Sequence, residues 1–249
     1  MKKLLPAVIV FSLLGVSAQA QILKDVLNKV VKKDSSGKTV LNKDILAGKN
    51  LSNDDIVSGL KEALRVGTDT STKKLGKLDG YFADAAVKIL MPSEAQKVEK
   101  TLRSLGMGSL VDKAILSMNR AAEDAAKGVG NIFWNSIKQM SITDGLQILK
   151  GSDTAATAYL KKTTTTELTN KFRPVIDSSL KKFDATKYWA DVFNAYNKVS
   201  LKKVNPDLTG YVTDKALSGL FYNIALQEQK IRKDPAAQVT DILKKVFGK

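Results

Sequence analysis

The chain has 249 residues, lacks both cysteine and histidine, and carries a formal net charge of +15. The two missing residue types exclude disulfides, thiolate or histidine-ligated metal sites, and every nucleophilic triad or dyad that relies on histidine. Carboxylate pairs, a serine–lysine dyad and an all-oxygen metal site are the catalytic arrangements that remain possible.

The first twenty residues have the three parts of a secretory signal peptide. Lys2 and Lys3 come first, an apolar run follows from Leu4 to Val16, and Ala18-Gln19-Ala20 precedes a suitable cleavage site. The apolar run is too short to span a bilayer comfortably, and no cysteine lies near the cut to carry a lipid anchor. We therefore expect cleavage near Ala20 and a periplasmic or secreted protein.

The mature chain stays strongly basic, because the signal contributes only two of the positive charges. Such a charge favours anionic partners, such as lipid headgroups, an envelope polymer or nucleic acid, although it also serves solubility alone. Export and the lack of a recognition-helix pattern disfavour nucleic acid. No later segment has the length and apolarity of a transmembrane span, and we expect no metal and no other cofactor.

Residues Ile22 to Lys33 place apolar side chains on one stripe and lysines off it, which predicts an amphipathic basic helix. The polar, glycine-interrupted residues 34–50 then resemble a linker. The helix could lie on a membrane surface or dock on the main domain. We favour docking, because the apolar face lacks the aromatic anchors of interfacial helices.

No strand pair, hairpin turn or repeat is evident in the chain, and from residue 51 onward helical stripes follow one another across short gaps. Residues 51–249 are therefore predicted to form one all-α, bundle-like domain of about nine to eleven helices. The first of these helices should begin at Ser52 with Asp55, which together match a capping box.

The stretch Ser141 to Thr166 predicts a helix, a sharp corner and a second helix. Ser141 with Asp144 matches a capping box, Gly151 suits a left-handed turn that ends a helix, and Ser152 or Asp153 can cap the next helix. The corner is the clearest local feature of the chain.

Four further patterns predict later helix boundaries. Thr164 with Glu167 matches another capping box, and Pro174 should kink the helix that follows. Asp184 should cap an aromatic helix that includes Tyr188 to Tyr196, and both this helix and the Phe221-Tyr222 pair favour core packing over a ligand pocket. Thr213 or Asp214 should begin the next helix. The last helix should have Asp234 as its cap and Pro235 at its first position.

Polar residues on otherwise apolar stripes are the best candidates for a site. These are Asn119, Arg120 and Glu123 on one helix, and Glu228 with Arg232 on another. Charged groups at such positions are buried only when they are paired. If the two helices face each other, the groups would form one cluster near the core. That cluster could orient an anionic or polar ligand, or it could fix helix register, which we favour.

Asp153, Thr154, Thr157 and the threonine run 163–166 supply hydroxyls and N–H groups near helix starts, which attract anions. Ordinary capping explains this group better than a ligand site does. The pairs Ser71/Lys74 and Ser179/Lys182 match serine–lysine spacing, but the match is weak in a chain rich in both residues. No catalytic residue is therefore assigned.

Several segments together resemble the bacterial domain-of-unknown-function family 4197. They are GLKEALRVGT (59–68), VKILMP (87–92), SMNRAAEDAA (117–126), the run 137–164 that contains ILKGSDTAAT, and residues 211–248. The resemblance covers roughly residues 51–248. It implies an exported, helical, single-domain protein and supplies no catalytic residue.

The sequence therefore favours an exported, non-catalytic binding or scaffold protein that holds an anionic amphiphile or envelope polymer. In this hypothesis lysines attract the anionic group and the helices offer an apolar recess. The alternative is a histidine-free hydrolase that acts on envelope material through Glu123 or Glu228. A cavity beside these glutamates, or a closed core around them, would discriminate between the two.

Overall fold

The computed structural model describes residues 31–33, 39–41, 52–182, 186, 189 and 207–247. Contacts divide the chain into two units, Met1–Asn50 and Leu51–Lys249. The predicted signal peptide and most of the predicted helix after Asp184 lie outside the described residues.

The described part of the first unit is a small antiparallel strand pair. Strand β1 (Val31–Lys33) pairs with β2 (Thr39–Leu41), and Lys32 lies opposite Val40. β-Branched residues favour strands. The sequence predicted a helix through Lys33 and no strand pair, so that prediction is wrong for residues 31–33; short β-branched runs are ambiguous between the two periodicities. Residues 22–30 lie outside the described part.

All regular elements described between residues 52 and 247 are helical, which confirms the all-α class. The α-helices described there are α3 (Asn53–Leu75), α4 (Gln96–Ser104), α5 (Gly108–Ala126), α6 (Gly130–Gln139), α7 (Ile142–Lys150), α8 (Ala155–Lys181), α10 (Leu208–Lys233) and α11 (Asp241–Phe247). Two short 3-10 turns, η1 (Ser93–Ala95) and η2 (Pro235–Ala237), precede α4 and α11. The eight α-helices of the described residues are slightly fewer than the nine to eleven expected for residues 51–249.

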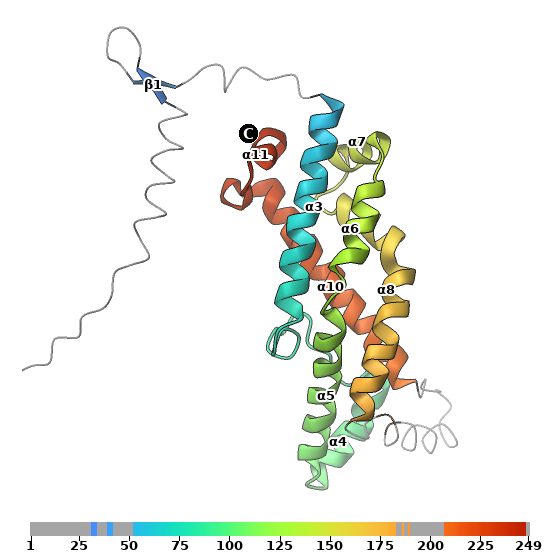
Figure 1. Ribbon diagram of the computed structural model, residues 1–249. Helices are drawn as coiled ribbons and strands as arrows, with labels where there is room; N and C mark the ends of the chain where they lie inside the picture. The colour runs from blue at the N-terminus through green and yellow to red at the C-terminus, as the bar shows by residue number, and fades with distance from the viewer. Residues whose placement is uncertain are drawn as a thin grey trace, which may run out of the picture. The chain divides into compact units, whose positions relative to one another are not determined.

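The long helices α3, α5, α8 and α10 enclose the core of the second unit. Helices α5 and α6 follow each other in similar directions, and α10 crosses α3, α5 and α8 (Figure 1). Phe133 from α6 meets Phe221 from α10 edge to ring at 6.2 Å between centroids. Other buried side chains at this centre are Leu60, Leu64, Met118, Leu160, Leu168, Phe172 and Leu220.

Helix α3 begins at the predicted capping box. The Ser52 hydroxyl accepts the Asp55 N–H at 3.0 Å, and the Asp55 carboxylate accepts the Ser52 N–H at 3.3 Å, which confirms that prediction. Gly59 then lets α11 approach closely, since a β-carbon there would lie 2.5 Å from the Val246 methyl group. A local pair of residues thus caps the start of α3, and a glycine allows the helix to pack closely against α11.

Helix α8 is longer than the sequence indicated. The predicted start at Thr164 and Glu167 is wrong, because both residues lie within α8. The Thr164 hydroxyl donates to the Leu160 carbonyl at 2.7 Å, and that of Thr163 to the Tyr159 carbonyl at 2.9 Å. Threonine in a helix can bond back to the carbonyl four residues earlier, so the run 163–166 continues the helix.

The corner before α8 is confirmed, but its geometry differs from the prediction. Ser141 and Asp144 form the predicted capping box of α7. Gly151 is extended (φ −78°, ψ −172°) and not left-handed. Glycine is still required there, because a β-carbon would lie 2.6 Å from that of Ala155. Close approach of the two helices, and not a left-handed turn, explains this glycine.

Helix α10 also begins earlier than predicted. Asp207 caps it by accepting the Gly210 N–H at 2.8 Å, so Thr213 lies inside the helix and not at its start. The Thr213 hydroxyl donates to the Thr209 carbonyl at 2.7 Å. After α10, Pro235 begins a short 3-10 turn and α11 starts only at Asp241, so the predicted start of the last helix at Asp234 and Pro235 is wrong.

Candidate functional site

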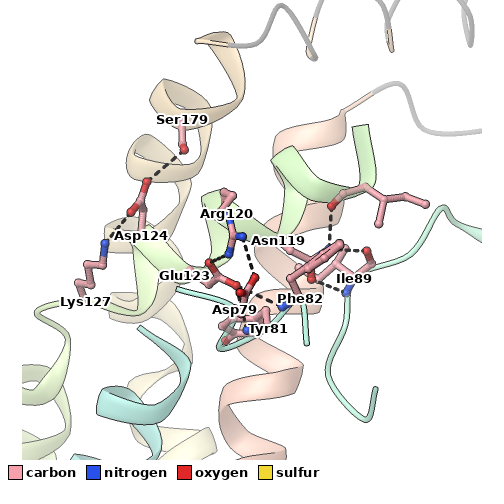
Figure 2. A network of polar contacts seen from close by, with 11 residues as sticks. Asp79, Tyr81, Phe82, Ile89, Asn119, Arg120, Glu123, Asp124, Lys127 and Ser179 are labelled. Carbon is pink, nitrogen blue, oxygen red and sulfur yellow. Dashed lines mark hydrogen bonds and ion pairs between the residues drawn. The ribbon is translucent and has the colours of Figure 1, made fainter. Parts of the chain in front are cut away.

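Helix α5 presents Glu123 to the loop that follows α3. The Glu123 side chain is only 3% exposed, and its Oε1 atom accepts the Tyr81 N–H at 3.1 Å and the Phe82 N–H at 3.2 Å (Figure 2). Its Oε2 atom accepts from Arg120 at 2.6 Å. Because both oxygens are engaged, the carboxylate serves as an anchor for the main chain of this loop.

Arg120 extends the anchor to the start of the loop. Its second terminal nitrogen donates to the Asp79 carboxylate at 2.7 Å (Figure 2). Asp79 has a positive φ of 64°, a conformation that aspartate tolerates better than most residues. The guanidinium also lies 5.7 Å from the centroid of the Phe82 ring. One arginine therefore links helix α5, a strained turn and an aromatic side chain.

Asn119 holds the next part of the same loop. Its fully buried amide accepts the Ile89 N–H at 2.8 Å and donates to the Ile89 carbonyl at 2.8 Å (Figure 2). It also donates to the Ile115 carbonyl at 2.7 Å. The Asn119 amide thus pairs with the main chain of Ile89 as a neighbouring strand would. These main-chain groups would otherwise be buried unpaired.

Sequence patterns did not reveal the loop residues on the other side of these bonds. Tyr81 is fully buried, and its hydroxyl donates to the Ala216 carbonyl in α10 at 2.7 Å. Burial raises the pKa of the Tyr81 phenol, and the nearby Glu123 carboxylate raises it further. The Asp79-Gly80 dipeptide, a common turn signal, was the one local indication of this arrangement.

The second predicted pair, Glu228 with Arg232 on α10, holds the corner between α7 and α8. Glu228 is 8% exposed and accepts the Ala156 N–H at 3.0 Å and both the N–H and hydroxyl of Thr157 at 2.8 Å. Arg232 donates to Glu228 at 2.8 Å and to the Ile148 carbonyl at 3.1 Å. The acid thus caps the start of one helix, and the base caps the end of another.

Asp153 and Thr154 lie at this corner, as their sequence position implies. Asp153 pairs with Lys233 at 2.5 Å on the surface. Hydrogen bonding to that ammonium group lowers the pKa of Asp153. Thr154 is the N-terminal residue flanking α8, but its side chain makes no capping bond. The predicted cap by Ser152 or Asp153 is therefore wrong, because the distant Glu228 accepts the N–H groups of Ala156 and Thr157 at this helix start.

The two glutamate clusters are separate, which corrects the expectation of one cluster near the core. Tyr81, whose N–H binds Glu123, contacts α10 at Ala216. Glu228 lies twelve residues further along α10, about 18 Å away at 1.5 Å per residue. Each cluster closes a different junction of the chain.

The surroundings of both glutamates are closed. The cavity that Glu228 and Arg232 line with Ala156 and neighbouring apolar residues has a volume of about 10 Å³, near the space of one water molecule. No group of three or more acidic residues that could hold a metal ion occurs among the described residues. The clusters therefore connect structural elements.

The serine–lysine pairs do not form dyads. Lys74 donates to Asp84 at 2.7 Å and to Asn223 at 2.9 Å, whereas Ser71 is completely buried. Hydrogen bonding to Lys74 lowers the pKa of Asp84. The Ser179 hydroxyl donates to Asp124 at 3.3 Å. Neither serine is activated by its lysine through a bond described in the structure.

An open groove of about 830 Å³ lies on the outer side of the loop that Asn119 and Glu123 hold. One wall is the segment 86–94, and the other is a stripe of α10. The α10 side chains in this groove are Tyr211, Lys215, Ser218 and Tyr222. Tyr211 joins the walls by donating its hydroxyl to the Leu90 carbonyl at 2.8 Å. The polar network therefore positions a surface concavity, although it does not line one itself.

No helix among the described residues is long and apolar enough to cross a membrane. Comparison with family models gives a match over residues 50–248 to the family described as "Protein of unknown function (DUF4197)". Comparisons with curated proteins and with solved structures gave no match. The family match spans the whole helical unit and confirms the resemblance of the quoted segments, so the chain belongs to this family.

Proposed function

We propose that the protein is an exported, non-catalytic binding protein of the cell envelope that holds an anionic partner on its lysine-rich surface. The observation that carries this proposal is the way positive charge is distributed. Every arginine of the chain is in an ion pair, and these arginines are Arg65, Arg103, Arg120, Arg173 and Arg232. The uncompensated positive charge therefore belongs to lysines.

Exposed lysines such as Lys97, Lys113 and Lys161 make no ion pair with another described residue. Lysine is a hydrated point charge on a flexible stem, whereas arginine favours fixed bidentate contacts. A surface of free lysines raises the local concentration of an anionic polymer or headgroup and remains sensitive to salt. Binding at the surface needs no apolar recess, so the recess expected from the sequence is not part of the proposal.

The rival function, hydrolysis through Glu123 or Glu228, has less support. A general acid or base must reach the reacting atoms of a substrate. Both carboxylates are instead buried, bonded to main-chain N–H groups and paired with arginine. Their geometry is that of residues that hold neighbouring segments of the fold together.

The test uses the mature protein, without residues 1–20, and two anionic probes. We expect it to bind phosphatidylglycerol vesicles or a soluble polyanion at low salt and to be released by high salt, with no binding to phosphatidylcholine vesicles or neutral dextran. Mass spectrometry of the periplasmic protein should give a chain that begins at Gln21. Absence of salt-sensitive binding to every anionic probe, or retention of the first twenty residues in a cytoplasmic protein, would contradict the proposal.

A further inference from the structure

The groove between segment 86–94 and α10 contains two lysines whose charge is not neutralised by a carboxylate of the described residues. The Lys88 ammonium lies 3.9 Å from the centroid of the Phe82 ring. The Lys215 ammonium lies 5.7 Å from that of Tyr211. A cation–π contact orients an ammonium group and leaves its positive charge available to an anion. Both lysines line the same groove, and neither has an ion pair with another described residue.

The stripe of α10 adds contacts of a second kind. Tyr211, Lys215, Ser218 and Tyr222 recur every three or four residues, so they share one face of the helix over about 16 Å. Tyr222 is 45% exposed and presents an aromatic side chain to solvent, and Ser218 adds an exposed hydroxyl. An aromatic face can stack on a sugar ring, a hydroxyl can bond to its hydroxyl groups, and an ammonium group can pair with its carboxylate. Groups of these three kinds in a row therefore suit an acidic polysaccharide.

The walls of the groove are rigidly held, which a binding site needs. Asn119 fixes Ile89 through both main-chain groups, and Glu123 fixes the loop at Tyr81 and Phe82. Tyr211 is stacked on Trp189, with 6.2 Å between the ring centroids. The side chains that face the groove therefore project from fixed main chain, which lowers the conformational entropy lost on binding.

The groove is an open surface concavity of about 830 Å³, so it suits a segment of a polymer more than a small molecule that must be enclosed. Glu94 lies at its Pro92 end and disfavours an anionic group there. The anionic groups of a bound chain are therefore expected beside Lys88 and Lys215.

We propose that this groove binds an anionic polysaccharide, with Lys88 and Lys215 contacting its acidic groups and Tyr222 stacking on a sugar ring. The inference rests on the proposed function and specifies the place and the chemical class of the ligand. It gives the Asn119 and Glu123 network a functional consequence, since that network fixes one wall of the groove.

The test measures binding of polygalacturonate to the full mature chain by calorimetry. The variant Lys88→Gln/Lys215→Gln should bind about tenfold more weakly or worse, because two charge-assisted contacts are lost. Tyr222→Ala should bind about three- to tenfold more weakly through loss of stacking. The matched control Lys161→Gln/Lys171→Gln removes the same charge from exposed positions of α8 and should stay within about twofold of the wild type. Circular dichroism should be unchanged in all variants.

Three results would overturn the inference. If the control variant weakens binding as much as the groove variant, the ligand is held by diffuse charge, and the proposed function survives without the groove. If poly-L-glutamate or phosphatidylglycerol vesicles depend on Lys88 and Lys215 while polygalacturonate does not bind, the ligand is not a polysaccharide. If the wild type binds no anionic probe at all, the proposed function fails together with the groove.

Discussion

The two buried Glu–Arg pairs share a local arrangement and differ in what they hold. Glu123 follows Arg120 by three residues, and Glu228 precedes Arg232 by four. Glu123 binds the main chain of an irregular loop, whereas Glu228 binds the first turn of α8. Glu–Arg pairs within one helical turn therefore serve two unlike junctions, and the pair alone does not indicate its target.

The two pairs also differ in burial and in the number of groups that depend on them. The Arg232 side chain is 11% exposed and that of Arg120 25% exposed. Glu228 accepts three donors from the start of α8 in addition to its arginine, whereas Glu123 accepts two from the loop. Removing one partner of a buried pair leaves the other charge uncompensated. We therefore expect Glu228 to matter more for global stability and Glu123 for the loop.

The largest effect is expected for Glu228→Gln. The variant leaves the Arg232 charge without its carboxylate and weakens the cap of α8, so the free energy of unfolding should fall by about 3–5 kcal/mol. Urea denaturation followed by circular dichroism measures this loss. The control Glu167→Gln, at an exposed position of α8, should change stability by less than about 0.5 kcal/mol. A similarly small loss for Glu228→Gln would contradict the conclusion that Glu228 stabilises the corner between α7 and α8.

Glu123→Gln should lower the free energy of unfolding by about 2–3 kcal/mol, because two main-chain donors and a half-buried arginine lose a charged acceptor. The distinctive result is local. Hydrogen exchange should accelerate at the Tyr81 and Phe82 amides well before it does at the first turn of α8. A larger global loss than that of Glu228→Gln, with no local change in exchange, would reverse the comparison.

Asn119→Ala tests the second anchor of the loop. It removes both bonds to Ile89 and should cost about 1–3 kcal/mol, the usual penalty for buried groups left unpaired. The same change at the exposed Asn135 of α6 should be nearly neutral, within about 0.5 kcal/mol. If polygalacturonate binding weakens in Asn119→Ala while Asn135→Ala binds normally, the link between this anchor and the groove is supported.

The smallest effect is expected for the pH dependence of the free energy of unfolding that comes from Tyr211. Burial raises the pKa of Tyr211 to about 12, and the neighbouring Glu94 adds to the shift. In the unfolded chain this phenol ionises near the ordinary tyrosine pKa of about 10, so its stabilising effect is complete below that pH and lost as pH rises toward about 12. Tyr211→Phe should therefore lose less stability than the wild type between these pH values, measured by urea unfolding. Identical pH profiles would contradict the burial of this phenol.

Local pairs were predictable from the sequence, and distant ones were not. The capping boxes Ser52–Asp55 and Ser141–Asp144 join residues three positions apart, so the pattern contains both partners. The threonine run 163–166 misled the prediction because the same residue type caps helices and bonds back inside them. Only packing of the surrounding chain selects between these uses.

The sequence by itself determined the helical class, the family and the polar residues on buried stripes, since helical period and spacing of three or four residues are local properties. The tertiary structure alone decided what these residues hold. Glu123 meets Tyr81 across 42 positions and Glu228 meets Ala156 across 72, and no local pattern encodes such contacts. The groove beside α10 arises in the same way, because its two walls come from segments that only the folded chain brings together.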